Sequence, residues 1–308
     1  MEKEYMSVKE AAEKWNISDR RVRALCETEK IVGVIKEGNS YKIPYDSMKP
    51  MDGRRQKGKV IAKEYQELFS RIESKKEELS RRRPLTQGEL KRLQEEFLLE
   101  FTYNSNAIEG NTLTLQETAM VLEGITIDKK PLKDHLEAVG HKEAFEYVQE
   151  LIAQKESFSE RMIKEIHSLV LMAQREDRGV YRKIPVKIMG AENEPPQPYM
   201  VPVLMEQLIQ EHKEQKKKMH LIEAVARFHL EFEGIHPFID GNGRTGRLLL
   251  NFELMQAGYL PINVKFADRR KYYEAFRSYH MEQNAEPMIL LIGGYVEEEL
   301  DKYLAILE

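Results

Sequence analysis

Signals that begin an α-helix recur along this chain, and they limit its fold more than any other feature of the sequence. In a capping box, a Ser or Thr side chain binds a free N–H group of the first helical turn, and a Glu three residues later binds back. Pro202 suits the first turn of a further helix. We therefore expect a mainly α-helical protein. Capping boxes are expected at Ser7 to Glu10, Thr86 to Glu89, Thr114 to Glu117 and Ser157 to Glu160.

Two segments depart from the helical pattern. Apolar and polar residues alternate at 34–36 and again at 41–43, with a Gly-Asn pair between them, which predicts a short β-hairpin. Residues 177–200 hold two glycines, a cluster of prolines and an alternating stretch at 186–188. This segment predicts a second short hairpin, inserted into the helical bundle.

The same patterns divide the chain into four parts. Residues 1–53 predict a small domain with two helices and the first hairpin, and residues 54–59 predict a basic linker. Residues 60–130 begin with a long, highly charged helix that Pro84 ends, and they continue with further helices. Residues 131–308 form the main helical domain.

The composition excludes several classes of protein. With 308 residues, 41% of them hydrophobic and 32% charged, the chain is long enough for about two domains and a substantial core. No apolar run approaches the ~20 residues that cross a bilayer, and the first residues lack the apolar stretch of a signal peptide. Cys26 is the only cysteine, so neither an internal disulfide nor a thiolate metal cluster is expected. We expect a soluble, cytoplasmic protein without a membrane partner.

The run from His236 to Arg247 joins two amphipathic helix patterns and is the most informative stretch of the chain. Gly241-Asn242-Gly243 lets successive N–H groups converge into an anion site at a helix N-terminus. Arg244 and Arg247 add positive charge on one helical face, which suits a polyphosphate. Asp240 can bind Mg²⁺ beside phosphate oxygens, and His236 can accept a proton near neutral pH. Together these residues predict attack by a hydroxyl on a nucleotide phosphate.

This run resembles the signature of the Fic family, H-x-F-x-D/E-G-N-G-R-x-x-R, and matches every fixed position. The resemblance implies that His236 is the general base that activates a Ser, Thr or Tyr hydroxyl of a target protein, and that Asp240 binds Mg²⁺. It also implies that the backbone of Gly241-Asn242-Gly243 binds the phosphates of ATP, with Arg244 and Arg247 on the β- and γ-phosphates. Fic enzymes typically transfer AMP from ATP to a protein hydroxyl. The expected fold is a Fic-type helical bundle with a β-hairpin flap, and residues 131–308 would be its catalytic domain.

Two further segments resemble parts of Fic domains. The predicted hairpin at 177–200 looks like the Fic flap, whose free edge would bind a segment of the target protein by strand addition at Val186 and Ile188. Tyr272 and Tyr273 resemble the tyrosines of the adenine pocket, with ordinary core packing as the alternative. His280 stands where many relatives have an asparagine, so the resemblance implies nucleotide binding there but leaves the choice of base open.

Ser105 and Glu109 lie four residues apart, so both face one side of a helical turn, which Gly110 ends. The segment resembles the Fic inhibitory motif, [S/T]-x-x-x-E-[G/N]. The resemblance implies that Glu109 pairs with Arg247 at the position of the γ-phosphate, so that ATP binds without its α-phosphate aligned. Because one arginine cannot serve two anions, we expect autoinhibition, and self-modification once it is relieved. In some relatives this glutamate also supports removal of AMP, and the sequence leaves that activity open.

The first 50 residues resemble the winged helix-turn-helix modules of excisionase and MerR-type proteins. Residues 1–59 contain 14 Lys and Arg against 10 Asp and Glu, whereas the whole chain has a net charge of -4. In such modules the second helix enters the major groove, so Arg20, Arg21 and Arg23 would contact DNA. A solvated face of a small docking domain is the alternative. These modules often act as pairs, which favours a homodimer.

The sequence therefore predicts a Mg²⁺-dependent protein adenylyltransferase, autoinhibited by Glu109 and joined to a DNA-binding module. Two alternatives stay open. One is a DNA-binding transcriptional regulator whose helical domain only binds a nucleotide, in which case His236 and Asp240 could be replaced without loss of activity. The other is transfer of UMP, GMP or phosphocholine, because an anion site binds phosphates and not bases.

Overall fold

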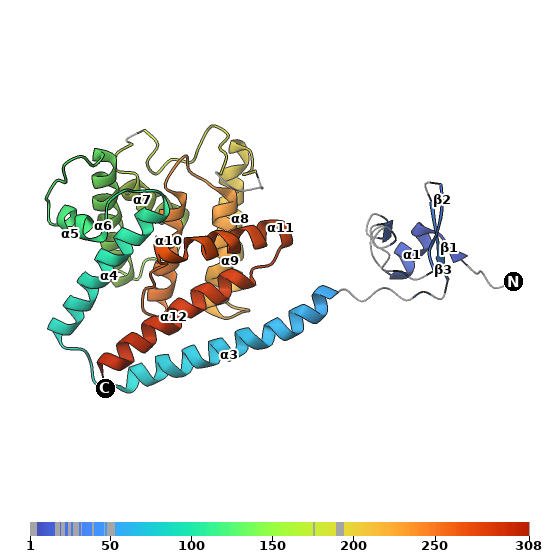
Figure 1. Cartoon of the computed structure of the whole chain (residues 1–308), viewed down its shortest axis with the longest axis horizontal. Helices are drawn as coiled ribbons and strands as arrows, with labels where there is room; N and C mark the ends of the chain where they lie inside the picture. The colour runs from blue at the N-terminus through green and yellow to red at the C-terminus, as the bar shows by residue number, and fades with distance from the viewer. Residues whose placement is uncertain are drawn as a thin grey trace. The chain divides into compact units, whose positions relative to one another are not determined.

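The computed structural model contains two compact units, Met1–Lys63 and Glu64–Glu308 (Figure 1). The long helix α3 (Gly53–Arg81) begins in the first unit and continues in the second. The predicted linker at 54–59 is thus helical, because it is rich in Arg, Lys and Gln, which favour helices. The structure describes residues 5–15, 19, 22, 23, 26, 31, 33–38, 40–45, 47, 53–174, 176–188 and 194–307, without the side chains of 37 and 53–64.

The first unit combines a small sheet with helical segments. Its antiparallel sheet has the strand order β1-β3-β2, with β1 (Tyr5–Met6), β2 (Ile35–Glu37) and β3 (Ser40–Pro44). Helix α1 (Val8–Trp15) begins at the predicted capping box of Ser7 and Glu10. The hairpin of β2 and β3 is confirmed. Strand β1 was not predicted, because two residues are too few to show alternation.

The predicted second helix of this unit is described at a few positions. Val22, Arg23 and Cys26 are helical. Val22 and Cys26 are buried in the core of the unit, whereas Arg23 is exposed. Arg20 and Arg21 lie outside the described residues.

The second unit is a helical bundle, which confirms the mainly α fold (Figure 1). Helices α9 and α10 pack on each other at its centre; α9 also contacts α8 and α12, and α10 contacts α6 and α7. No helix in the described ranges is both long and apolar enough to span a bilayer. The remaining elements are α4 (Gln87–Ile108), α5 (Leu115–Leu122), α6 (Leu132–Ala153), α7 (Glu160–Val170), η1 (Pro198–Met200), α8 (Val201–Gln215), α9 (Leu221–Ile235), α10 (Asn242–Gln256), η2 (Phe266–Asp268), α11 (Arg269–Glu282) and α12 (Glu286–Ile306).

Side-chain caps begin several of these helices. The capping boxes at Thr86 and Thr114 are present as predicted, at the starts of α4 and α5. Helix α7 begins two residues later than predicted, with Ser159 rather than Ser157 as its N-cap. Phe158 stands between the two serines and is buried in the core. The start of α7 therefore lies beyond this buried ring and not before it.

The segment predicted as a second hairpin forms no hairpin in its described residues. The described residues between 177 and 197 contain no strand, and the prediction is wrong there. Several prolines in this stretch lack the N–H group that a strand pair needs. In addition, the guanidinium of Arg182 binds the backbone carbonyls of Ile184 and Pro196. Residues 177–197 are called the flap below.

Candidate functional site

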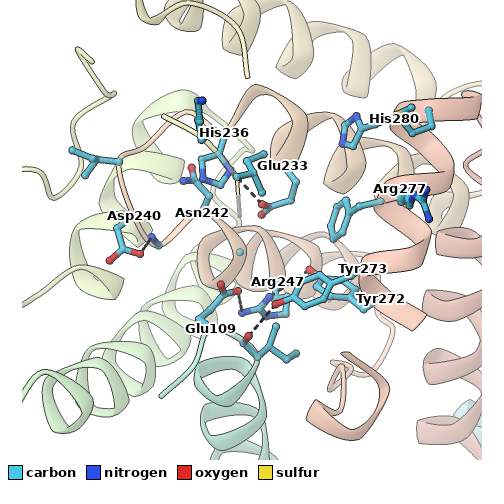
Figure 2. A pocket seen from close by; sticks show the side chains of 18 residues that line it. Glu109, Glu233, His236, Asp240, Asn242, Arg247, Tyr272, Tyr273, Arg277 and His280 are labelled. Atoms are coloured by element: carbon cyan, nitrogen blue, oxygen red, sulfur yellow. Dashed lines mark hydrogen bonds and ion pairs between the residues drawn. The ribbon is translucent and has the colours of Figure 1, made fainter. Parts of the chain in front are cut away.

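A cavity of about 540 Å³ opens in the second unit, between residues 236–247, the end of α4, α11 and the flap (Figure 2). Arg244, Ser105 and Val186 do not belong to its wall, although the sequence points to them. The structure thus brings together residues from four separate stretches of the chain. The predicted residues that line the cavity are Glu109, Ile188, His236, Asp240, Gly241, Asn242, Gly243, Arg247, Tyr272, Tyr273 and His280.

His236 ends helix α9 in a left-handed backbone conformation, with φ of 50° and ψ of 61°. Its Nδ1 atom is buried and lies 3.8 Å from Oε2 of Glu233, and 19% of its side chain is exposed. Burial lowers the pKa of His236 to about 4, although Glu109 and Asp240 act in the opposite direction. The imidazole is therefore neutral at pH 7, and its Nε2 atom is left to accept a proton.

The backbone that follows His236 is held in place by buried side chains. The Asn242 side chain accepts a hydrogen bond from the N–H of Phe238 and donates one to its carbonyl, both at 2.9 Å. Phe238 is fully buried, and its ring stacks on His167 with centroids 3.6 Å apart. Gly241, with φ of 76°, leads into α10 without a side-chain cap. The free N–H groups of the first turn of α10 therefore lie at the cavity wall, where they favour an anion.

Asp240 lies at the rim of the cavity, with 37% of its side chain exposed. Its Oδ1 accepts hydrogen bonds from the N–H of Gly241 at 2.6 Å and from Arg244 at 3.2 Å, and Lys133 lies 3.8 Å from Oδ2. Burial acts to raise the pKa of Asp240, but Arg244 and the N–H of Gly241 outweigh it and lower the pKa. The described ranges hold no group of three or more His, Cys, Asp or Glu that could bind a metal. One ionised carboxylate beside an anion site nevertheless fits Mg²⁺, which takes its other ligands from phosphates and water.

The two arginines of α10 have different surroundings. Arg247 lines the cavity and is 1% exposed; it donates to Oγ and the carbonyl of Ser105, at 3.0 and 2.7 Å, and to Oε1 of Glu109 at 2.8 Å. Arg244 is equally buried but lies behind the cavity wall, 3.0 Å from Glu137, and it also binds the aspartate at the rim. The structure therefore does not bring Arg244 to the cavity beside Arg247, because two carboxylates hold its guanidinium.

Glu109 is the C-cap of α4 and is followed by Gly110, with φ of 93°. Its carboxylate lies directly over the backbone of Gly243, so close that a Cβ atom at that position would clash with Oε1 of Glu109. Figure 2 shows the same carboxylate beside Arg247. Glu109 thus occupies the space above the first turn of α10, where an anion bound by that helix would lie.

Tyr272, Tyr273 and His280 line the part of the cavity formed by α11 (Figure 2). Tyr272 is buried, and its hydroxyl lies 2.6 Å from Nε2 of His229, so it also belongs to the core. Tyr273 is half exposed and donates a hydrogen bond from its hydroxyl to the carbonyl of Ile108, at 2.9 Å. One of the two tyrosines is thereby tied to the end of α4.

Several residues of the cavity wall have no counterpart among the residues predicted from the sequence. Glu233 is the most unusual of them, because burial and the negative charge of Glu109 raise its pKa to about 8. The sequence does hold a signal for this residue, because Glu233 stands three residues before His236, on the same side of α9. The same helical spacing from Tyr273 would have pointed to two others. The missed residues are Ile108, Lys187, Glu233, Ile239, Phe276, Arg277 and Met281.

Four buried histidines predict that this unit loses stability in acid. Burial lowers the pKa of His167 and His236 to about 4, of His229 to about 3, and of His141 well below its usual value. Between pH 6.5 and 4 the unfolded chain binds protons that the native chain does not, so each of these histidines lowers the stability of the native state as the pH falls. Glu233 offsets the effect of about one of these four histidines, because its raised pKa makes the native state, and not the unfolded chain, bind a proton in this pH range. We expect the midpoint of thermal unfolding, followed by circular dichroism, to fall steeply from pH 6.5 to 4.5; a constant midpoint would contradict this.

The sequence of this chain is similar to those of known proteins. Residues 157–254 match the Fic/DOC family. A protein adenylyltransferase Fic from Culex quinquefasciatus is 35% identical over 243 residues, which is 78% of this chain and 48% of that protein. Another from Nematostella vectensis is 35% identical over 247 residues, covering 78% and 56%. The chain spans about half the length of these curated relatives.

Solved structures share the fold of the second unit. Fic-1 from C. elegans superposes with a TM-score of 0.74 at 25% identity, over 82% of this chain and 76% of that one. A Fic domain containing signaling protein from Bacteroides thetaiotaomicron gives a TM-score of 0.66 at 29% identity, over 79% and 94%. The matched family segment contains α7, α8, α9 and nearly all of α10, and with them the run 236–247. This chain therefore contains a domain of the Fic/DOC family.

Proposed function

We propose that this chain is a protein adenylyltransferase, which transfers AMP from ATP to a Ser, Thr or Tyr hydroxyl of a target protein. Relatives with 35% identity are named protein adenylyltransferases. The observation that supports the proposal most is that the neutral imidazole of His236 and the uncapped N-terminus of α10 share one cavity. A base beside an anion site is what attack of a hydroxyl on a phosphate requires.

In the proposed step, the target hydroxyl oxygen bonds to the α-phosphorus of ATP while its proton passes to Nε2 of His236. The bond from the α-phosphorus to the oxygen that bridges to the β-phosphate breaks, and pyrophosphate leaves with that electron pair. The free N–H groups at the start of α10 stabilise negative charge on the phosphate oxygens. Because His236 is neutral at pH 7, it can accept the proton without first losing one.

We propose that Asp240 holds Mg²⁺ on the phosphates of ATP. When bound, Mg²⁺ neutralises phosphate charge and makes the α-phosphorus easier to attack. Arg244 has an indirect part: its guanidinium, 3.2 Å from Oδ1 of Asp240, orients this carboxylate and keeps it ionised. Arg247 faces the cavity and would bind the terminal phosphates.

Glu109 would hold this activity back. Arg247 is buried, and its guanidinium is shared between Ser105 and Glu109, so it cannot bind a terminal phosphate while Glu109 stays in place. The Glu109 carboxylate also lies over Gly243, where it repels a second anion at the start of α10. Activation would therefore require the end of α4 to move.

The two ends of the cavity would bind the base and the target. Tyr272, Tyr273 and His280 present aromatic surface on α11, which suits the stacking of a purine. Ile188 of the flap lines the cavity, and Val186 precedes it by two residues. A target segment that lay along this part of the flap would bring its hydroxyl towards His236.

Mass spectrometry of the Glu109→Gly protein after incubation with ATP and Mg²⁺ tests the proposed function. We expect one AMP group to be added to the chain or to a supplied target, and no such product when His236→Ala is introduced into the same background. An added group of another mass, formed only with another nucleotide, would favour the transfer of UMP, GMP or phosphocholine. Binding of ATP without any covalent product would favour a nucleotide-sensing regulator and would overturn the proposal.

A second proposal concerns the first unit, which we infer to bind DNA. Arg23 is exposed on a helical segment whose other side is buried, and residues 1–59 have an excess of positive charge. A gel shift with DNA upstream of the gene, at low salt, tests this inference. We expect a shift that is lost when Arg20, Arg21 and Arg23 are all replaced by Ala. No shift in the parent protein would favour a docking domain instead.

A further inference from the structure

Arg182, in the flap, binds the backbone of His236 and of the residues before and after it. Its Nε atom donates to the carbonyl of His236 at 2.8 Å, and one terminal nitrogen donates to the carbonyl of Ile235 at 3.4 Å. The backbone N–H of Arg182 donates to the carbonyl of Pro237 at 3.0 Å. One flap residue therefore binds three consecutive carbonyls, at positions 235, 236 and 237.

The guanidinium of Arg182 is part of the interior rather than the surface. Arg182 is 4% exposed, and burial lowers its pKa. Among the described residues its hydrogen-bond acceptors are all backbone carbonyls, the other two being those of Ile184 and Pro196. Carbonyls at the end of a helix have no partner within the helix and bear partial negative charge, so a cation is favoured there. The end of α9 thus provides acceptors and favourable potential for a buried cation.

His236 needs such support, because its backbone is left-handed, a conformation that residues with a side chain rarely adopt. Its N–H donates to the carbonyl of Phe232 at 3.0 Å, and its own carbonyl accepts from Arg182. Both polar groups of its backbone are therefore bound, one by α9 and one by the flap. The direction of the imidazole follows from this backbone conformation.

We propose that Arg182 is a positioning residue for His236: by binding the carbonyls of residues 235–237, it sets the direction in which the imidazole enters the cavity. The flap is then more than a border of the cavity, because it holds the base. Arg182 lies outside the cavity wall, so its removal should alter the turnover number and leave ATP binding nearly unchanged. The inference rests on the proposed function for this rate effect alone.

Nuclear magnetic resonance of the full chain with labelled histidine tests the inference without any nucleotide. The chain has eight histidines, and His236→Ala assigns the signal of His236. We expect Arg182→Gln to shift the imidazole signals of His236 and to leave those of His229, in the middle of α9, in place. Lys183→Gln, which changes the exposed cation next in the flap, is the matched control and should shift neither.

Arg182→Lys covers the case in which Arg182→Gln does not fold. Lysine keeps the charge but cannot bind all of these carbonyls, so a smaller shift of the His236 signals is expected. If the His236 signals of a folded Arg182→Gln or Arg182→Lys protein matched those of the parent, the positioning role would be refuted.

The rate of AMP transfer gives a second readout, in the Glu109→Gly background. We expect Arg182→Gln to lower kcat by roughly 10- to 100-fold, as misplacement of a reacting group by about 1 Å does, with the KM for ATP changed less than about threefold. A loss confined to KM would contradict the role given to Arg182. Absence of transfer in the Glu109→Gly parent itself would count against the proposed function instead, and the His236 signals would still decide the inference.

Discussion

Replacement of Glu109 by Gly is expected to raise the incorporation of labelled AMP by roughly 10- to 100-fold. The reason is competition for one buried guanidinium: Arg247 donates to Glu109 at 2.8 Å, and it becomes available to a terminal phosphate once that carboxylate is removed. A hydrogen bond between charged groups contributes about 1.5–3 kcal/mol, which corresponds to this range of rates. Binding of ATP, measured by calorimetry, should change less than the rate, because the N–H groups of α10 remain.

The chain offers a matched control for this substitution. Glu123 is the C-cap of α5, with φ of -86° and ψ of 3°, and Glu109 is the C-cap of α4 with φ of -86° and ψ of 4°. Each glutamate is followed by a glycine with positive φ, Gly110 and Gly124. Glu123→Gly should therefore reproduce any backbone effect without releasing Arg247. Equal incorporation in wild type and Glu109→Gly would show that Glu109 does not inhibit.

Replacement of His236 by Ala is expected to lower AMP transfer by about 10²- to 10⁴-fold, the usual contribution of a general base. The imidazole of His236 is neutral at pH 7 and its Nδ1 atom is buried, so Nε2 is the nitrogen that we expect to accept the proton. The substitution leaves the start of α10 and Asp240 in place, so ATP should still raise the midpoint of thermal unfolding. Initial rates with labelled ATP in the Glu109→Gly background give the measurement.

A histidine at the opposite end of the same helix is the control for this prediction. His220 is the N-cap of α9, where its Nδ1 atom accepts a hydrogen bond from the N–H of Ile222, and it is not part of the cavity wall. His220→Ala should lower stability slightly and leave the rate nearly unchanged. Transfer that survived in His236→Ala at the parent rate would remove the base from the mechanism.

Local sequence patterns predicted most of the helices and the central run of the site. The capping boxes at Thr86 and Thr114 were correct, because the bonds that form them join residues three apart and need no tertiary partner. The same holds for Gly241 and Asn242, which shape the start of α10 through contacts within a few residues. At α7 the local pattern was wrong by two residues: the N-cap is Ser159, after the buried Phe158, and a spacing rule carries no information about burial.

The flap shows the limit of local patterns most clearly. Alternation at 186–188 predicted a strand, but the pattern cannot show whether a second strand lies opposite. Arg182 binds the carbonyls of Ile184 and Pro196 and also that of His236, which lies 54 residues away in the chain. Likewise, the sequence placed Arg244 and Arg247 on one face, and only the positions of Glu137 and Glu109 separated their surroundings.

By itself the sequence determined that this chain is mainly helical, that a turn framed by two glycines follows His236, and that Ser105 and Glu109 lie one helical turn apart. The tertiary structure decided that the Glu109 carboxylate lies over Gly243 and that Arg182 of the flap binds the end of α9. The physical reason is how far apart in the chain the interacting residues lie. Caps and turns depend on bonds between near neighbours, whereas the direction of a buried guanidinium or carboxylate depends on which partners the folded chain brings within about 3 Å.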